Sequence, residues 1–132
     1  MSDLHPTSMI YISQSRMPHA GRGVFAKEAI KKGETIERCP TIEIPLYEQE
    51  IINQTMLVSY IYYLGESKDM LTIVLGFGSI YNHSYTPNAI YDPLSDDGLV
   101  QFIAEKDIKK DEEICVNYNQ EVQTKTPLWF EY

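Results

Sequence analysis

Residues 76–88 read Gly-Phe-Gly-Ser-Ile-Tyr-Asn-His-Ser-Tyr-Thr-Pro-Asn, and residues 112–118 read Glu-Glu-Ile-Cys-Val-Asn-Tyr. The first segment combines glycines, an Asn-His-Ser run and a Pro-Asn turn. This composition is typical of backbone that comes close to a ligand rather than of a regular element. The second segment is an acidic turn that leads into an apolar strand with a tyrosine at its end. Such a strand delivers one phenol to a defined place, so the two segments predict a ligand site.

The chain has 132 residues, the usual size of one domain with one core. We expect a single domain over residues 1–132, with its core at about 9–119 and a closing segment at 120–132. The hydrophobic fraction of 43% favours a folded protein over a disordered one. No run approaches the roughly 18 apolar residues of a spanning helix, and the first residues lack the features of a secretory signal. We therefore expect an intracellular protein without a membrane partner, cytoplasmic if its source is bacterial.

The net charge of −8 disfavours DNA or RNA as a direct partner, because phosphate binding needs clustered lysines and arginines. An acidic surface would steer a basic peptide towards the protein, although ordinary solubility explains the charge equally well. The two cysteines, Cys39 and Cys115, lie in no metal-ligand spacing with a histidine, so we expect no metal site. Burial as small apolar side chains is the simpler reading of both.

The hydrophobic pattern predicts a mainly β protein with few short helices. The first predicted strands are residues 9–13, 21–26 and 35–44, with a polar corner at 28–34 and a break or an edge at Cys39-Pro40. Residues 47–57 are the best helix candidate. The later strands are residues 58–64 and 70–75, joined as a hairpin, then 90–92 and 99–104 as a second hairpin, and 114–118. The last residues, 127–132, are too aromatic to be left in water.

Three motifs occur in an order and spacing that resemble the SET-domain family of protein lysine methyltransferases. Residues 21–23 match its Gly-x-Gly turn, residues 82–88 its Asn-His-Ser-x-x-Pro-Asn motif, and residues 112–118 its Glu-Glu-Leu/Ile-x-x-x-Tyr motif. The first motif is weak evidence alone, whereas the other two together are specific. The resemblance covers most of the chain, which looks like the small stand-alone SET proteins of bacteria and viruses.

The resemblance implies a fold of small curved sheets whose C-terminal part passes through a loop to form a pseudoknot. It also implies transfer of a methyl group from S-adenosylmethionine, leaving S-adenosylhomocysteine, to a lysine of a basic protein or peptide. A histone, a histone-like protein or a ribosomal protein would fit, with chromatin as a place of action. A desolvating channel would lower the pKa of the lysine amine, and alignment would supply most of the rate.

By the same resemblance, Tyr118 is the catalytic tyrosine, and Glu113 is a structural acid that bonds to backbone amides. The residues implied in cofactor binding are Ala20, Arg22, Gly23, Ser79, Ile80, Asn82, His83, Tyr118 and Trp129. Those implied in the substrate channel are Tyr81, Tyr91, Tyr60 and Cys39. For Trp129, simple closure of the core is an alternative role.

Two departures from the family pattern leave alternatives open. Cys39 followed by Pro40 stands where many members have a channel tyrosine, so Tyr60 or Tyr62 must supply that hydroxyl or it is missing. The number of methyl groups added is therefore open. Flanking cysteine-rich zinc segments are absent, which leaves Trp129 and its neighbours to close the site. A non-catalytic SET-like module that binds a lysine peptide is the alternative function, and a homodimer is a further possibility.

Overall fold

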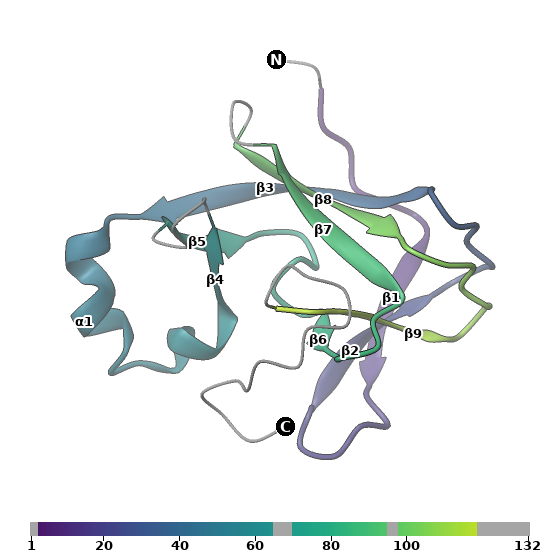
Figure 1. The fold of residues 1–132 in the computed structure, drawn as a ribbon, viewed down its shortest axis with the longest axis horizontal. Coiled ribbons are helices and arrows are strands. Elements are labelled where there is room, and N and C mark those ends of the chain that lie inside the picture. Colours follow the sequence, from purple (N-terminus) through teal and green to yellow (C-terminus); the bar gives the residue numbers. More distant parts are fainter. Residues whose placement is uncertain (1–2, 65–69, 95–97, 119–132) are drawn as a thin grey trace.

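The computed structural model describes residues 3–64, 70–94 and 98–118. Within these ranges the strands form two sheets (Figure 1). A four-stranded sheet has the order β1-β2-β9-β6, and a five-stranded sheet has the order β4-β5-β3-β8-β7. The chain is therefore mainly β, as the sequence predicted.

The four-stranded sheet consists of β1 (Ile10–Gln14), β2 (Arg22–Ala26), β6 (Asn82–His83) and β9 (Glu113–Val116). The five-stranded sheet consists of β3 (Thr35–Ile44), β4 (Ile61–Leu64), β5 (Met70–Val74), β7 (Ala89–Leu94) and β8 (Leu99–Ala104). Both predicted hairpins are present as antiparallel pairs, β4 with β5 and β7 with β8. Residues 65–69 and 95–97 of their predicted turns lie outside the described residues.

Strand β9 brings the three sequence motifs together. On one side it pairs antiparallel with β2, and on the other it pairs parallel with β6, where Asn82 lies opposite Cys115 and His83 opposite Val116. Segments that are about 30 to 90 residues apart in sequence thus become neighbouring strands. The predicted closing segment, and with it the passage of the C-terminus through a loop, lies beyond Tyr118 and outside the described residues.

Strand β3 is continuous through Cys39 and Pro40, where the sequence predicted a break or an edge. Its partner changes at this point, since residues up to Pro40 pair with β8 and residues 41–44 pair with β5. Pro40 has no N–H to donate to a ladder, and its carbonyl accepts from the Leu75 N–H at 2.9 Å. The proline therefore marks the junction of two ladders rather than the end of a strand.

The predicted helix at residues 47–57 is shorter than expected. A single α-turn, α1 (Gln49–Ile52), lies between two 3₁₀ turns, η1 (Leu46–Glu48) and η2 (Met56–Tyr60). The second of these takes up residues 58–60, which the sequence placed in a strand. Ile52 is buried, whereas Ile51 is 66% exposed and Tyr47 is 84% exposed. Leu46, Met56 and Leu57 are exposed as well. The lobe of residues 46–60, at the left of Figure 1, therefore buries few of its apolar side chains.

The core lies between the two sheets and holds one cluster of buried side chains from both. At its centre the Tyr81 ring stacks on Phe102, with ring centroids 4.2 Å apart. Cys39 and Cys115 are free and buried, as predicted. The corner at residues 28–34 is fixed by reciprocal backbone hydrogen bonds of 2.8 Å between Ile30 and Ile108. No helix in the described ranges has the length and apolar character needed to cross a membrane.

Candidate active site

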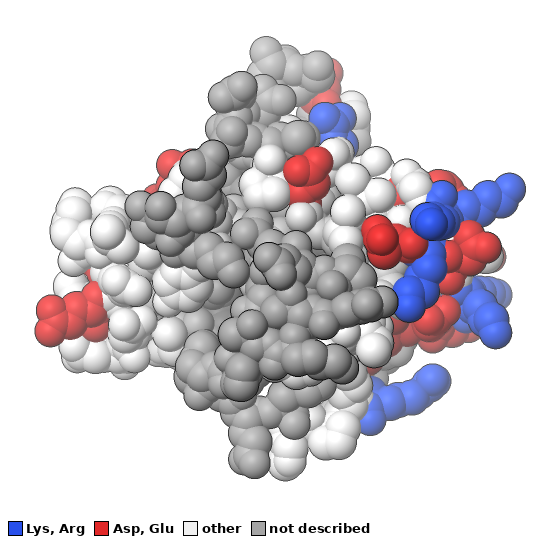
Figure 2. Space-filling model, in the orientation of Figure 1, with Lys and Arg blue, Asp and Glu red and all other residues white. Residues whose placement is uncertain are grey.

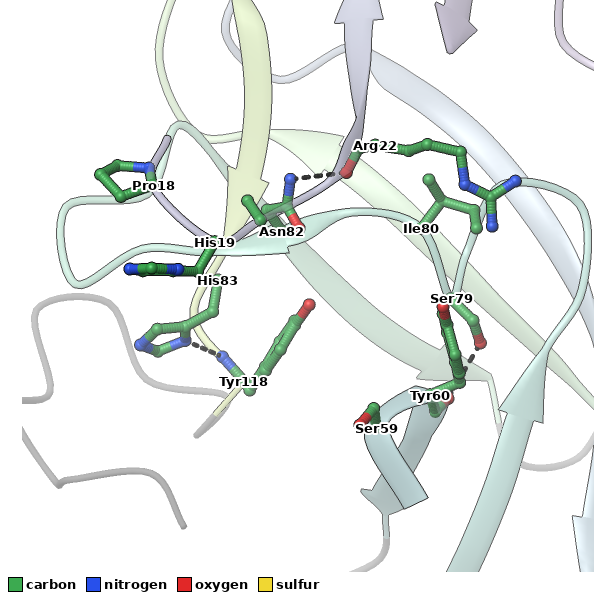
Figure 3. A pocket seen from close by; sticks show the side chains of 11 residues that line it. Pro18, His19, Arg22, Ser59, Tyr60, Ser79, Ile80, Asn82, His83 and Tyr118 are labelled. Atoms are coloured by element: carbon green, nitrogen blue, oxygen red, sulfur yellow. Dashed lines mark hydrogen bonds between the residues drawn. The ribbon is translucent and has the colours of Figure 1, made fainter. Parts of the chain in front are cut away.

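A cavity of about 310 Å³ opens where the two sheets meet the η2 turn (Figure 3). Its walls come from the β1–β2 loop, the η2 turn, the segment from β5 into β6, and the end of β9. The lining residues are Pro18, His19, Ala20, Arg22, Ser59, Tyr60, Ser79, Ile80, Asn82, His83 and Tyr118. Seven of the nine predicted cofactor residues are among them. Of the other two, Gly23 adjoins the wall through Arg22, and Trp129 lies outside the described residues.

Asn82 occupies one wall of the cavity with its amide group held in one orientation. Its Nδ2 donates to the Arg22 carbonyl at 2.9 Å and to Glu113 Oε2 at 2.8 Å. Because these bonds use both amide hydrogens, the side chain has its Oδ1 oxygen left to offer a ligand. Asn82 is therefore a fixed acceptor, suited to an ammonium or another N–H donor.

Glu113 holds this arrangement in place. Its carboxylate accepts from the Asn82 amide and from the Ser15 hydroxyl at 2.7 Å, so its partners are side chains, where the sequence suggested backbone amides. A Cβ atom at Gly23 would overlap Glu113 Oε2 and lie 3.1 Å from Asn82 Nδ2. The glycine is thus required by the close approach of the Glu113 side chain.

His83 is buried beside the cavity and acts as a backbone anchor. Its Nδ1 accepts from the Tyr118 N–H at 3.0 Å, so the neutral ring carries its proton on Nε2. Burial lowers the pKa of His83 from 6.5 to about 4. The imidazole is therefore neutral near pH 7 and can keep accepting this bond.

Tyr118, the predicted catalytic residue, is held at three atoms. Its hydroxyl donates to the Tyr81 carbonyl at 2.5 Å, its N–H donates to His83, and its carbonyl accepts from the Tyr91 hydroxyl at 2.8 Å. Since the phenolic proton is donated to Tyr81, the phenolic oxygen presents its lone pairs to the cavity. The phenol is thus placed as a hydrogen-bond acceptor at the cavity wall (Figure 3).

Ser79 and Ile80 can offer the cavity their carbonyl groups. Their N–H groups are donated inside the preceding turn, to Val74 at 3.1 Å and to Phe77 at 2.9 Å. The Ser79 hydroxyl donates to the Tyr60 carbonyl at 3.1 Å, which ties this segment to the η2 turn. Together with Asn82 Oδ1 and the Tyr118 oxygen, these groups make this part of the wall rich in acceptors.

The four predicted channel residues occupy different places. Tyr60 lines the cavity, whereas Cys39, Tyr81 and Tyr91 are buried and lie outside its lining. Tyr91 reaches the site through its bond to the Tyr118 carbonyl. Tyr62, the alternative source of a hydroxyl, packs edge-on against Tyr91 at 4.9 Å and Tyr118 at 5.9 Å and donates to the Gly78 carbonyl. Tyr62 and Tyr91 thus form an aromatic layer next to Tyr118.

Sequence reasoning missed Pro18, His19 and Ser59 as lining residues. His19 has φ = 62°, a left-handed conformation that is uncommon for a residue with a side chain and is concentrated at functional sites. The Pro-His-Ala-Gly run at residues 18–21 indicates a turn ahead of the Gly-x-Gly motif. It does not indicate which of these side chains face a cavity. In the described part of the chain no group of three or more His, Cys, Asp or Glu side chains could hold a metal ion.

Comparison with known proteins defines the class of this chain. The family model for the SET domain matches residues 21–119. A Schizosaccharomyces pombe protein named histone-lysine N-methyltransferase, H3 lysine-37 specific, is 35% identical over 112 residues, which are 84% of this chain and 71% of that protein. The chain belongs to the SET-domain family.

Solved structures agree with this assignment. A crystal structure of a Plasmodium falciparum protein, provisionally described as a histone methyltransferase, has a TM-score of 0.63 and 35% identity. The match covers 87% of this chain and 95% of that one. An autoinhibited Polycomb Repressive Complex 2 bound to S-adenosylmethionine matches with a TM-score of 0.69 and 21% identity, over 91% of this chain and 16% of that one. At that identity the second match supports the fold alone.

Proposed function

We propose that this protein transfers a methyl group from S-adenosylmethionine to the side-chain amine of a lysine in a basic protein. The observation that carries the proposal is the Tyr118 phenol, which donates its proton to the Tyr81 carbonyl at the wall of a cavity rich in acceptors. The S. pombe relative, named as a histone-lysine methyltransferase, supports the same reaction class. We propose histones as the first substrates to examine, with chromatin as the corresponding place of action.

The polar groups of the cavity fit this cofactor. S-adenosylmethionine carries an ammonium and a carboxylate at one end and a positive sulfur beside them. Asn82 Oδ1 is a fixed acceptor for the ammonium, and the Arg22 side chain at the same wall can pair with the carboxylate. The carbonyls of Ser79 and Ile80 and the Tyr118 oxygen suit positively polarised methyl and methylene groups through C–H···O contacts.

When bound, the cofactor supplies a methyl group on a sulfonium, which a neutral amine can accept in line. The protein has three tasks, which are to orient the amine, to exclude water and to favour the neutral form of the amine. Tyr118, held by Tyr81, His83 and Tyr91, orients the amine through its oxygen lone pairs. The layer that Tyr62 and Tyr91 form beside it excludes water and favours the neutral amine, because desolvation lowers the pKa of a lysine. Positioning of this kind is worth up to about 7–11 kcal/mol in favourable cases, so no general base is needed.

The charge distribution supports a basic substrate. Residues 39–64, which contribute Ser59 and Tyr60 to the cavity, contain three glutamates (Glu43, Glu48 and Glu50) and no lysine or arginine. In Figure 2 the lobe of residues 46–60, at the left, shows uncharged and acidic residues, whereas most lysine and arginine side chains gather at the opposite end, interspersed with acidic ones. A lysine-rich segment would therefore be attracted to the side of the molecule that borders the cavity.

Isothermal titration with S-adenosylmethionine and S-adenosylhomocysteine tests the cofactor part of the proposal. We expect micromolar binding by the wild type and a loss of about tenfold or more in Asn82→Ala, because a hydrogen bond to a charged group is worth about 1.5–3 kcal/mol. Asn53→Ala, at the exposed C-cap of α1, is the matched control and should bind like the wild type. Equal affinity in wild type and Asn82→Ala would contradict the site described above. Cofactor binding with no transfer to any protein would instead favour the non-catalytic lysine-peptide module.

A further inference from the structure

Glu37 is a buried acid that the motifs did not point to. It lies in β3 and is 7% exposed, and no other carboxylate in the described ranges is buried to this degree. Its Oε1 accepts from the Tyr81 hydroxyl at 2.9 Å, and its Oε2 accepts from the Phe77 N–H at 3.0 Å. Burial, together with the Glu37 charge, raises the pKa of the nearby Cys39 thiol. Burying a carboxylate among neutral donors costs folding free energy that an apolar residue would not, which suggests a role beyond packing.

Glu37 is connected to the Tyr118 hydroxyl through a single residue. Tyr81 donates its phenolic proton to Glu37 and offers its own carbonyl to the hydroxyl of Tyr118 at 2.5 Å. Between these two bonds the Tyr81 ring is fully buried and stacks on Phe102. Because the core around the Tyr81 ring is closely packed, a shift of its phenol cannot be accommodated by the ring alone. It would also move the Tyr81 carbonyl, which accepts from the Tyr118 hydroxyl.

The turn ahead of β6 is shaped around the same carboxylate. Gly76 has φ = +65°, and a Cβ atom built there would lie 2.5 Å from Glu37 Oε2. The next residue, Phe77, donates its N–H to this oxygen. The turn then leads into Ser79 and Ile80 at the cavity wall. The Glu37 carboxylate thus holds two parts of the site. One is the turn that leads to Ser79 and Ile80, and the other is Tyr81, whose carbonyl accepts from Tyr118.

We propose that Glu37 is a positioning residue for methyl transfer, which acts through Tyr81 to set where the Tyr118 hydroxyl lies. This inference rests on the function proposed above. It does not require Glu37 to touch cofactor or substrate. Because a misplacement of about 1 Å in an active site can cost about 100-fold in rate, such a residue is expected to govern turnover more than binding.

The kinetic test compares Glu37→Gln, Tyr81→Phe and the double variant with the wild type, using labelled cofactor and a histone substrate. Glu34→Gln is the matched control, because Glu34 is exposed and bonds only to the backbone of its own turn among the described residues. We expect kcat to fall about tenfold or more in each single variant while KM and cofactor affinity change less than about twofold. The double variant should be no worse than either single one. A folded Glu37→Gln protein with wild-type kcat would overturn the inference, and Tyr81→Phe tests the same link if Glu37→Gln does not fold.

A readout without activity separates this inference from the proposed function. In protein carrying ¹³C-labelled tyrosine, the Tyr118 signal can be assigned by its absence in Tyr118→Phe. We expect Glu37→Gln to shift that signal and Glu34→Gln to leave it in place. An unshifted signal would overturn the inference. If the wild type methylates no protein, the proposed function fails, and this spectrum alone decides whether Glu37 positions Tyr118.

Discussion

His83 links the active-site candidate to pH. Between pH 6.5 and about 4 the unfolded chain binds a proton on this residue that the folded chain does not. The contribution of neutral His83 to the free energy of unfolding is therefore complete above pH 6.5. This contribution falls by an amount on the order of 2–3 kcal/mol as the pH drops towards 4. Protonation would also end the bond that Nδ1 accepts from Tyr118.

Urea unfolding of wild type and His83→Gln across this pH range measures the effect. The stability advantage of the wild type should shrink as the pH falls from 6.5 to 4. His19→Gln, a change of the same kind at an exposed histidine in the cavity wall, should keep the wild-type pH slope. Parallel slopes for wild type and His83→Gln would show that His83 is not the group responsible.

Gly23 offers a second test at the scale of one residue. In Gly23→Ala the new methyl group overlaps Glu113 Oε2, so we expect Glu113 to turn away and release Asn82. Cofactor affinity, measured by titration calorimetry, should fall about tenfold, in line with the loss of a hydrogen bond to a charged group. Introducing Glu113→Ala first should abolish the further effect of Gly23→Ala. Additive losses would mean that Gly23 serves the cofactor directly.

At the level of single residues, the sequence indicates a candidate where a side chain belongs to a local motif. Asn82, His83 and Tyr118 could be proposed because short runs of sequence carry them, and they meet at one cavity. Glu37 could not, since its bond to Tyr81 joins residues 44 positions apart and nothing local to either one indicates it. Ser59 was missed for a similar reason, because only the path of the η2 turn brings it to the wall.

At the scale of elements, the alternation of residues identified most strands but did not reveal how they combine. The predicted break or edge at Pro40 was wrong, because β3 continues through the proline and exchanges one partner strand for another there. The pattern at residues 47–57 suggested a longer helix than the one present. Its apolar residues at helical spacing would predict a buried face, and most of them remain exposed.

Ile51 and Ile52 form a matched pair that tests this description of α1. Ile52 is 8% exposed and Ile51 is 66% exposed. Replacing Ile52 by Ala should lower the free energy of unfolding by about 2–4 kcal/mol, as for buried isoleucines elsewhere. The same change at Ile51 should cost less than about 0.5 kcal/mol. Chemical denaturation of both variants measures the difference, and equal losses would contradict the burial described for α1.

At the scale of the whole molecule, the two ends differ in charge. The corner at residues 27–34 and the turn at residues 105–112, which are joined through Ile30 and Ile108, hold six lysines beside six Asp and Glu residues, whereas the lobe beside the cavity has glutamates and no lysine or arginine. This distribution cannot be read from a net charge of −8, because it depends on which loops the fold brings together.

Charge reversal on the lobe should weaken substrate binding selectively. We expect the double variant Glu48→Lys, Glu50→Lys to raise KM for a basic protein about tenfold at low salt, with the difference reduced at high salt by screening. Lys109→Glu with Lys110→Glu reverses two charges at the far end and should change KM little. A larger effect from the far pair would move the substrate to the other side of the molecule.

The central claim is that Tyr118 directs methyl transfer from this cavity to a lysine. Transfer of labelled methyl from S-adenosylmethionine to core histones, measured for wild type and Tyr118→Phe beside a sample whose lysines are chemically blocked, tests it most directly. The account predicts label on unblocked histones with the wild type, none on the blocked sample, and a rate about 100-fold lower with Tyr118→Phe despite nearly unchanged cofactor binding. Equal rates for Tyr118→Phe and the wild type, or equal labelling of the blocked histones, would contradict it.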